Sequence, residues 1–297
     1  MHFAVLCSPD SWYLKDLRRA AADRHEITSV AFRQLAATCA TEGETFFAGS
    51  LDLARVDAVL VRTMPPGTLE QVVFRMDLLA RLEAAGTLVI NPARAIEAAV
   101  DKYLASVKLA AAGLRTPRTA VCQTVDEALA AFTGLGGDVV VKPLFGAEGR
   151  GITRLVDEAI AQRAFSLLVQ LGAVLYLQEF IPHDGYDLRV LVIGRRMWGM
   201  RRRNPLDWRT NVSRGATAEP LEVTPELADL ARRAADAIGA PVAGVDLLPA
   251  PEGPPYAIEV NAVPGWQALS RVLKVDIASH VLEFVETLVR RGGATSA

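Results

Sequence analysis

The first third of the chain alternates short apolar runs, rich in β-branched residues, with longer segments of helical periodicity. The apolar runs are residues 3–7, 27–32, 56–61 and 87–90, and the helical segments are residues 12–23 and 69–85. Strands and helices in alternation are typical of an open parallel sheet. We therefore predict a small α/β domain over residues 1–95, which ends where Asn91-Pro92 breaks the pattern.

The pattern then changes, because glycine-rich loops now separate short strands. We expect a helix at 101–112, then strands at 119–122, 139–142, 151–156 and 174–180, with helices at 125–132 and before 171. This segment, residues 96–181, is predicted to form a central subdomain. Residues 182–297 follow with a hairpin around Gly194, a polar loop at 204–218, a helix that begins after Thr224, and a C-terminal helix at 276–290. They are predicted to form a C-terminal subdomain.

Two apolar runs near the C-terminus contain polar residues. Asp246 lies in the run 244–248, and Glu259 and Asn261 lie in the run 257–263. An unpaired carboxylate in a core is strongly destabilising, so these side chains need a cation or a hydrogen-bonding partner. Alternation points Glu259 and Asn261 to one face, and Asp246 can join them from a neighbouring strand. One interpretation is a Mg²⁺ site that bridges nucleotide phosphates, and the other is two edge strands whose polar residues face water.

A glycine-rich loop follows the valine run that ends at Lys142. The loop, residues 144–151, contains Gly146, Gly149 and Gly151, and a strand resumes after it. Walker and dinucleotide-binding loops open a helix, whereas this loop is bracketed by strands, which suggests a flap whose N–H groups fold over phosphates. An ammonium group at the end of a buried run needs an anion, and a phosphate would serve. The alternative is that Lys142 reaches out to the surface.

Other charged residues are candidates for ligand contacts. Lys102 opens a helix, where a cation opposes the helix dipole, so it is either placed for a ligand or solvated at the surface. Asp187 and Arg189 share a strand face and can pair with each other or with solvent. The three arginines 201–203 cannot all face solvent, so at least one meets an anionic ligand or a structural carboxylate. The four histidines show no spacing for a nucleophilic triad or a zinc site, and we interpret them as structural.

Composition limits the functional classes. The 297 residues are 51% apolar and 22% charged, which excludes a disordered chain, and a net charge of −2 gives no reason to expect a nucleic acid or an anionic membrane as partner. Three cysteines without metal-binding spacing favour a reducing cytoplasm. No apolar run approaches the length of a membrane span. We therefore expect a cytoplasmic protein.

Taken in order, these segments resemble the ATP-grasp ligases, and most closely the RimK-like branch, which joins an amino acid, typically glutamate, to a carboxylate. The matching segments are Asp101-Lys102, Val141-Lys142-Pro143, the loop to Gly151, Gln178-Glu179-Phe180-Ile181, Asp187-Leu188-Arg189, Arg209-Thr210-Asn211, Gly244-Val245-Asp246, Glu259-Val260-Asn261 and Pro264-Gly265. The ordered series, from roughly residue 95 to the end, is specific. It implies that an N-terminal parallel-sheet domain precedes an ATP-grasp fold of two subdomains that clamp ATP.

The resemblance also implies roles for these residues. Those that would contact ATP are Lys102, Lys142, Gly146, Gly149, Gly151, Glu179, Phe180, Asp187, Arg209 and Asn211. The backbone of Glu179 and Phe180 would face the adenine. Those that would hold two Mg²⁺ ions, for which Mn²⁺ could substitute, are Asp246, Glu259 and Asn261.

In the implied reaction, the γ-phosphoryl group passes to an acceptor carboxylate and gives an acyl phosphate, which an amine then attacks. Arg202 or Arg209 would stabilise the oxyanion as catalytic residues. The partners would be a small-molecule or peptide carboxylate and an amino acid, and the protein would be a homo-oligomer. The alternatives are a nucleotide-binding regulator that kept the fold without the chemistry, and a ligase of the same fold with a different amine or bond specificity.

The chain departs from its relatives in two places. Residues 204–208 read Asn-Pro-Leu-Asp-Trp and are poorer in glycine and acids, which leaves open which arginine is catalytic. After Asn261, the pair Pro264-Gly265 is followed by Trp266, in a loop that should border the acceptor pocket. A tryptophan there could stack on a planar acceptor such as a pterin-type coenzyme.

Overall fold

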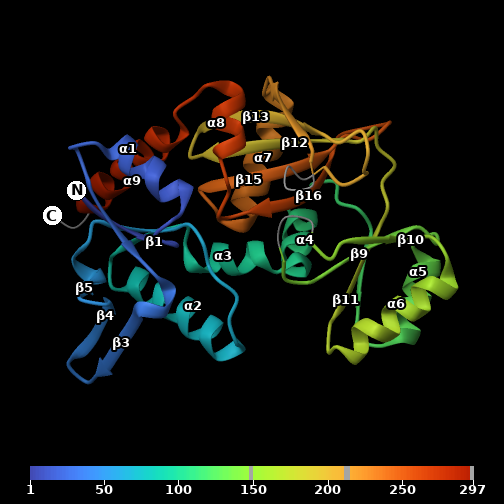
Figure 1. Ribbon diagram of the computed structural model, residues 1–297, viewed down its shortest axis with the longest axis horizontal. Coiled ribbons are helices and arrows are strands. Elements are labelled where there is room, and N and C mark those ends of the chain that lie inside the picture. The colour runs from blue at the N-terminus through green and yellow to red at the C-terminus, as the bar shows by residue number, and fades with distance from the viewer. Residues whose placement is uncertain (147–149, 211–214, 295–297) are drawn as a thin grey trace.

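Three large sheets follow one another along the longest axis of the molecule (Figure 1). The computed structural model describes residues 1–146, 150–210 and 215–294. The N-terminal sheet lies at one end, the sheet within residues 119–179 lies at the other end, and the sheet within residues 186–261 lies between them. Every helix within the described ranges is too short or too polar to cross a membrane.

The N-terminal sheet is parallel and has helices on both faces. Its strand order is β2 (Glu26–Val30), β1 (His2–Leu6), β6 (Ala58–Val61) and β7 (Leu88–Ile90). Alternate strand residues enter two different apolar cores. One core includes α2 (Leu69–Ala84), and the other includes α1 (Trp12–Ala21) and the C-terminal helix α9 (Ile277–Ala294). The predicted parallel α/β fold of this part is confirmed.

A small antiparallel sheet between β2 and β6 was not predicted. It consists of β3 (Leu35–Ala40), β4 (Gly43–Ala48) and β5 (Leu51–Asp52), flanked by the 3₁₀ turns η1 (Phe32–Gln34) and η2 (Leu53–Arg55). Nearly all of β3 is exposed, so no alternation of apolar and polar residues marks it in the sequence.

Two consecutive helices join the N-terminal sheet to the rest of the molecule. They are α3 (Ala93–Val100), which was not predicted, and α4 (Lys102–Ala111), which was. The Asp101 carboxylate begins α4 by accepting hydrogen bonds from the N–H groups of Tyr103 and Leu104. Both helices contact β16 (Tyr256–Asn261) of the C-terminal sheet. The boundaries near residues 95 and 181 stay a proposal, and α3, which spans residue 95, packs on a strand of the C-terminal sheet.

The central sheet is antiparallel and has its own core. Its order is β10 (Thr153–Leu155), β9 (Val139–Lys142), β11 (Leu175–Glu179) and β8 (Thr119–Cys122). The helices α5 (Val125–Gly134) and α6 (Glu158–Gln170) pack on it, and their apolar residues form a cluster separate from the two larger cores. The strand, glycine loop and strand arrangement predicted from the sequence is present, because β9 and β10 pair antiparallel on either side of the loop.

The C-terminal sheet is also antiparallel. Its order is β14 (Thr217–Leu221), β13 (Arg196–Arg203), β12 (Tyr186–Ile193), β15 (Val242–Leu248) and β16. The helix α7 (Pro225–Ile238) begins at the Thr224 cap and covers one face, and α8 (Gln267–Leu273) packs with α9 on the other. The sequence predicted the hairpin of β12 and β13 and the helix α7, but it did not predict β14 or α8.

Asn91 connects the N-terminal sheet to the C-terminal sheet. Its side chain is almost fully buried, and its Nδ2 donates hydrogen bonds to the carbonyls of Val242, at 2.6 Å, and Ala262. Its Oδ1 accepts a hydrogen bond from the Val242 N–H at 3.0 Å. The residue that breaks the sequence pattern is therefore a polar link between the ends of two sheets.

Candidate active site

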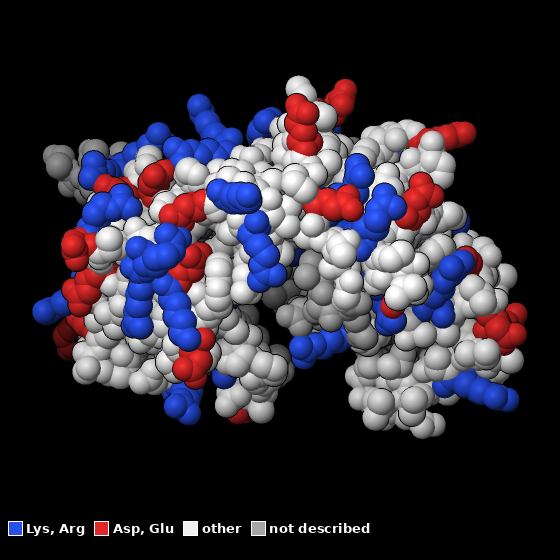
Figure 2. All heavy atoms as spheres, turned by 45° about the horizontal axis from the view of Figure 1, so that its top comes forward, with Lys and Arg blue, Asp and Glu red and all other residues white. Residues whose placement is uncertain are grey.

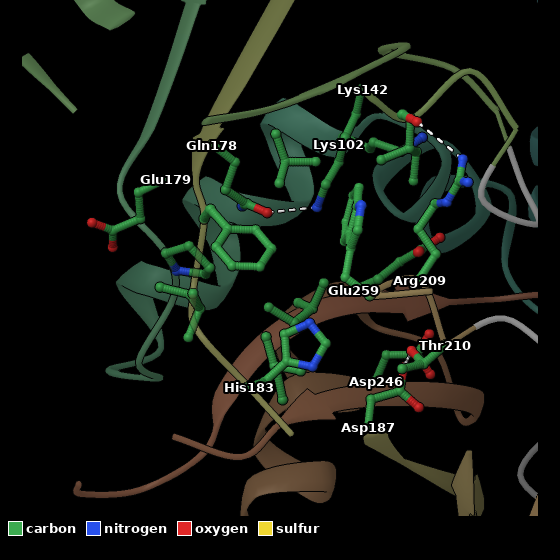
Figure 3. Close-up of a pocket in the computed structure, with 18 of the residues that line it drawn as sticks. Lys102, Lys142, Gln178, Glu179, His183, Asp187, Arg209, Thr210, Asp246 and Glu259 are labelled. Atoms are coloured by element: carbon green, nitrogen blue, oxygen red, sulfur yellow. Dashed lines mark hydrogen bonds between the residues drawn. The ribbon is translucent and has the colours of Figure 1, made fainter. Parts of the chain in front are cut away.

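An open cleft lies between the central sheet and the C-terminal sheet (Figure 3). The predicted site residues that line it are Lys102, Lys142, Glu179, Phe180, Asp187, Arg202, Arg209, Asp246 and Glu259. Gly149 and Asn211 were also predicted, and they lie outside the described residues. The cleft therefore brings together most of the residues that are spread over more than half of the sequence.

Lys142 ends β9 and turns its ammonium group into the cleft (Figure 3). Its Nζ donates a hydrogen bond to Gln178 Oε1 at 2.5 Å. Burial lowers the pKa of Lys142 to about 8, although the negative charge of Glu259 opposes part of this shift. The alternative in which Lys142 reaches out to the surface is therefore wrong. A desolvated ammonium group gains stability when an anion binds beside it.

Lys102, the first residue of α4, holds the start of the glycine loop. Its Nζ donates hydrogen bonds to the carbonyls of Gly146, at 2.9 Å, and Leu144, at 3.3 Å. Burial lowers the pKa of Lys102, and the charge of Glu259 opposes the shift. Gly151 closes the loop with a φ of +71°, and a Cβ there would lie 2.9 Å from the ring of Pro143. Glycine is therefore required at this position for both space and backbone conformation.

The two carboxylates of the predicted metal site face each other across two strands. Asp246 of β15 pairs in register with Glu259 of β16, so both side chains lie on one face of the sheet. Asn261 lies opposite Gly244, and its Oδ1 accepts a hydrogen bond from the N–H of Val263 at 2.8 Å. Asp246 and Glu259 therefore lie side by side, as the sequence predicted. The side-chain oxygen of Asn261, by contrast, already accepts a hydrogen bond from its own loop.

Asp246 is ion-paired with two arginines. Arg189 forms a bidentate pair with it, at 2.6 and 2.7 Å, and Arg202 Nη2 lies 2.9 Å from its Oδ2. Burial alone would raise the pKa of Asp246, but the two guanidinium groups hold it below its ordinary value. The carboxylate is therefore ionised, and both of its oxygens are held by guanidinium groups.

Asp187 is the second carboxylate held by Arg202. The guanidinium group of Arg202 binds it through Nε at 2.7 Å and Nη2 at 2.5 Å, and Thr210 Oγ1 donates a further hydrogen bond at 2.5 Å. Burial raises the pKa of Asp187, and Arg202 opposes this effect. The suggestion that Asp187 pairs with Arg189 or with solvent is wrong, because each pairs with a residue on the neighbouring strand. Among the arginines 201–203, the buried Arg202 pairs with the carboxylates of Asp187 and Asp246.

The end of β11 was predicted to face the adenine with the backbone of Glu179 and Phe180. The Glu179 N–H donates to the carbonyl of Arg118 at 2.9 Å, and the Phe180 N–H donates to that of Asp138 at 3.0 Å. Both N–H groups are therefore used within the central sheet. The N–H of Ile181, which also lines the cleft, makes no hydrogen bond within the described part of the chain.

The acidic side chains suit a hard cation that also binds oxygens of a ligand. Asp246 and Glu259 offer carboxylate oxygens to the cleft. Within the described ranges, no group of three or more His, Cys, Asp or Glu side chains is placed to hold a metal ion. Two carboxylates leave most of an octahedral shell to be completed, which fits Mg²⁺ bound together with phosphates better than a closed structural site.

Trp266 does not border the cleft. It has no exposed surface, its Nε1 donates a hydrogen bond to Asp16 Oδ2 at 2.8 Å, and its ring packs edge to face against Tyr13 with centroids 5.0 Å apart. Both partners lie on α1. The prediction that Trp266 stacks on a planar acceptor is therefore wrong, because N-terminal residues remote in sequence bury it completely.

Trp208 and His183 line the cleft, although the sequence did not mark either as a ligand contact. Trp208 packs edge to face against Phe180, with centroids 5.8 Å apart, and His183 lies 5.9 Å from the same ring. Arg209, next to Trp208, forms a bidentate ion pair with Asp207. One feature of the sequence could have marked Trp208 as a cleft residue. It directly precedes the motif Arg209-Thr210-Asn211 and lies in the stretch 204–208 that departs from the family pattern.

A family model described as the RimK-like ATP-grasp domain matches residues 99–285, which include every element that forms this cleft. The chain belongs to the RimK-like ATP-grasp family. It is an ATP-dependent carboxylate–amine ligase, as this family is, and the predicted fold and enzyme class are confirmed.

Members of the family with similar sequences are ligases. The tetrahydromethanopterin:alpha-L-glutamate ligase of Methanosarcina acetivorans is 30% identical, over 96% of this chain and 98% of that protein. A probable alpha-L-glutamate ligase of Coxiella burnetii is also 30% identical, over 91% of this chain and 90% of that protein. The predicted resemblance to alpha-L-glutamate ligases is therefore confirmed at the level of family.

Solved structures share the whole architecture. The RimK domain ATP-grasp protein from Sphaerobacter thermophilus has a TM-score of 0.74 at 25% identity and covers 96% of this chain and 99% of its own. The ATP-grasp ligase PsnB, solved with a minimal precursor, Mg and ADP, has a TM-score of 0.75 at 21% identity, with 97% of both chains covered. The N-terminal sheet and the clamp of two subdomains therefore recur together as one fold.

Proposed function

We propose that this ligase joins L-glutamate to a carboxylate of a pterin-type acceptor, at the expense of ATP. The relatives named as tetrahydromethanopterin:alpha-L-glutamate ligases match nearly the full chain, which supports both substrates. The observation that carries the chemistry is the arrangement of the cleft, where Lys102 and Lys142 face the carboxylates Asp246 and Glu259. Two cations and two anions around one space suit a magnesium–nucleotide complex.

In this proposal the lysines bind the phosphates and the carboxylates bind magnesium. Asp246 and Glu259, joined by Asn261, would hold two Mg²⁺ ions, and Mn²⁺ could replace them. A metal held by these residues would supply positive charge that offsets the charge on the phosphates during transfer of the γ-phosphoryl group to the acceptor carboxylate. Gly146 and Gly151 would shape the loop over the phosphates, and Gly149 and Asn211 would make ATP contacts of the same kind.

The adenine would lie against β11 and the residues that follow it. The N–H of Ile181 is the backbone donor that is available there, because Glu179 and Phe180 have already used theirs. Trp208 and Phe180 offer aromatic surface beside it. The carbonyl of Glu179 and the N–H of Ile181 could together read the adenine edge, while Asp187 would approach the ribose or phosphate side.

Of the two arginines predicted to be catalytic, we propose that Arg209 stabilises the oxyanion and that Arg202 positions the aspartates. Arg202 is buried and shared between Asp187 and Asp246, so its charge is already neutralised. Within the described ranges, Arg209 forms an ion pair with its near neighbour Asp207 and donates a hydrogen bond to the carbonyl of Ile152 at 3.4 Å. A guanidinium group on the cleft wall can turn towards the developing charge at a small cost.

The test is turnover with defined substrates. The purified protein should release ADP with ATP, Mg²⁺, L-glutamate and tetrahydromethanopterin, and the product should gain the mass of one glutamyl residue. Reactions without acceptor, or with D-glutamate or L-aspartate, are the controls. Turnover with another acceptor or amine only would establish the ligase of different specificity. ATP binding without ADP release for any acid and amine pair would favour the non-catalytic regulator. Self-association and a cytoplasmic location also stay predictions.

A further inference from the structure

Arg62 lies at a position in the N-terminal sheet where α/β proteins bind ligands. In the order β2-β1-β6-β7, β2 follows β1 along the chain and lies on one side of it, whereas β6 lies on the other side. The strand order therefore reverses between β1 and β6, which makes this the topological switch point. Ligands bind in open parallel sheets outside the carboxyl ends of the strands at such a point. Arg62 directly follows β6, and its N–H donates to the carbonyl of Leu6, the last residue of β1, at 2.9 Å.

The guanidinium group of Arg62 is buried without an acidic partner. Only 7% of the residue is exposed, and its guanidinium carbon lies 4.2 Å from the ring centroid of Trp266 and 5.0 Å from that of Tyr13. Nη2 donates to the carbonyl of Pro264 at 2.6 Å, but Nε has no hydrogen-bond partner. Within the described residues no carboxylate forms an ion pair with it, and burial lowers its pKa to about 10.

A buried cation of this kind is costly unless an anion pairs with it. The neighbouring end of α1 also favours an anion. No acidic residue lies in its first turn, and the Ser11 side chain does not cap it, so the free N–H groups there give the site further positive character. The described residues supply neither charge balance nor a full set of acceptors for Arg62. A ligand can supply both.

The loop that accepts the hydrogen bond of Arg62 packs against the strand that carries the metal end of the cleft. Pro264, whose carbonyl accepts from Arg62, approaches Gly244 so closely that a Cβ there would lie 3.1 Å from Pro264 Cβ. The same Cβ would lie 3.8 Å from Nε of Arg189, which binds Asp246. The Pro264 loop thus lies between Arg62 and the strand that carries Asp246.

We propose that Arg62 binds an anionic group, a carboxylate or a phosphate, of the acceptor, at a distance from the carboxylate that becomes phosphorylated. The proposal rests on the proposed ligase function, because a molecule that presents one carboxylate to the phosphates must extend away from the nucleotide. The lysines on the opposite side of the cleft already serve the nucleotide. The substrate class is therefore an acceptor with at least two anionic groups.

A purely structural role would give Arg62 a different pattern of substitution effects. If Arg62 only holds Pro264, Arg62→Gln and Arg62→Lys should both lower the free energy of unfolding, and neither should change the KM of one substrate selectively. If Arg62 binds an anion, Arg62→Gln should selectively weaken the binding of one substrate and Arg62→Lys should do so much less, because lysine keeps the charge and glutamine removes it. The two variants together thus distinguish the roles, provided that both fold, which circular dichroism and thermal unfolding establish.

The first measurement is the KM for tetrahydromethanopterin in the ADP-release assay. Arg62→Gln should raise this KM by about 10- to 100-fold, which is the effect of losing a hydrogen bond to a charged group, and Arg62→Lys should raise it much less. The KM values for ATP and L-glutamate should stay near those of the wild type. An unchanged acceptor KM in Arg62→Gln, or a change confined to the KM for glutamate, would overturn the proposal.

The second measurement does not depend on turnover. Trp266 lies under the guanidinium group, so tryptophan fluorescence should report a saturable titration with glutarate or inorganic phosphate in the wild type that Arg62→Gln abolishes. If tetrahydromethanopterin supports no turnover but this titration is seen, the proposed acceptor is wrong and the anion site stands. If turnover is seen and neither the KM nor the fluorescence depends on Arg62, the ligase stands and the anion site is wrong.

Discussion

Arg202 lies between two aspartates, with its Nη2 2.5 Å from Asp187 and 2.9 Å from Asp246. All three side chains are buried beneath the cleft. Because Arg189 also binds Asp246, two guanidinium groups and two carboxylates balance each other there. The carboxylate expected to bind magnesium is thus held in one orientation before any ligand arrives.

Removal of Arg202 should therefore be severe. Arg202→Met leaves two buried carboxylates with less compensation, and we expect the free energy of unfolding to fall by about 3–5 kcal/mol. Arg201→Met is the matched control, because Arg201 is only half-buried and lies 3.9 Å from Glu219, so this substitution should cost less than about 1 kcal/mol. Urea unfolding of both variants is the measurement. Equal losses in the two would show that the buried pairing does not contribute as described.

In the part of the chain that the structure describes, no arginine pairs with Glu259, so the loss of Glu259 should affect catalysis more than folding. We expect Glu259→Gln to reduce acceptor-dependent ADP release by at least about 100-fold at a fixed Mg²⁺ concentration, because a metal ligand is lost. Raising Mg²⁺ should restore part of the rate. The exposed Glu252 provides the control substitution Glu252→Gln. Turnover that survives Glu259→Gln unchanged would contradict the assignment of the metal end.

The depressed pKa of Lys142 makes ATP binding depend on pH. In the resting protein its ammonium group loses its proton near pH 8, whereas its ordinary pKa is 10.5. Phosphates favour the charged form, so the affinity for ATP should fall as the pH rises above 8, by at most about tenfold per pH unit. Calorimetric titration between pH 7 and pH 10 tests this expectation. Lys142→Met should bind ATP weakly at every pH, and Lys108→Met should behave like the wild type.

The depressed pKa of Lys142 also makes the stability of the folded protein depend on pH. Burial of charged Lys142 destabilises the folded state fully below pH 8, and the effect disappears as the pH rises to 10.5. The wild type should therefore gain stability over this interval relative to Lys142→Met, by up to roughly 3 kcal/mol. Urea unfolding at several pH values would reveal it. A constant difference between the two proteins across the interval would refute the depressed pKa.

Substitution of Trp266 should affect stability, whereas substitution of Trp208 should affect nucleotide binding. Trp266→Ala should reduce the free energy of unfolding by about 3–5 kcal/mol, because the ring is fully buried and bonded to Asp16. Trp208→Ala, on the wall of the cleft, should change it by less than about 1 kcal/mol and should alter nucleotide affinity instead. Denaturant unfolding and nucleotide titration of both variants separate these effects. A stable Trp266→Ala protein would contradict its role in the core.

The sequence predicted those parts of the site that depend on local periodicity. Alternation along strands was enough to place Asp246 and Glu259 on one face, and the run that ends at Lys142 was enough to identify a desolvated ammonium group. The partners of Arg189 and Arg202 were not predictable, because cross-strand neighbours depend on a register that only the assembled sheet defines. Trp266 was misplaced for the same kind of reason. Its environment comes from α1, at the other end of the sequence.

The net charge and the surface charges give little further information about the site. Figure 2 shows acidic and basic side chains interspersed over one face of the molecule, as expected for a net charge of −2. The informative charges are the buried ones, and their sign and pairing follow from tertiary contacts. Arg62 illustrates this, because it adjoins an ordinary apolar strand in the sequence and lies at the meeting point of β1, β6 and the Pro264 loop in space.

The link made by Asn91 has a mechanical consequence. It fixes the N-terminal sheet to β15 and to the residue that follows β16, and a continuous apolar core covers both parts. The central sheet alone has a core of its own. Opening and closing of the cleft can therefore occur by rotation of that one lobe. Spent nucleotide could then leave while the sheet that carries Asp246 and Glu259 keeps its shape.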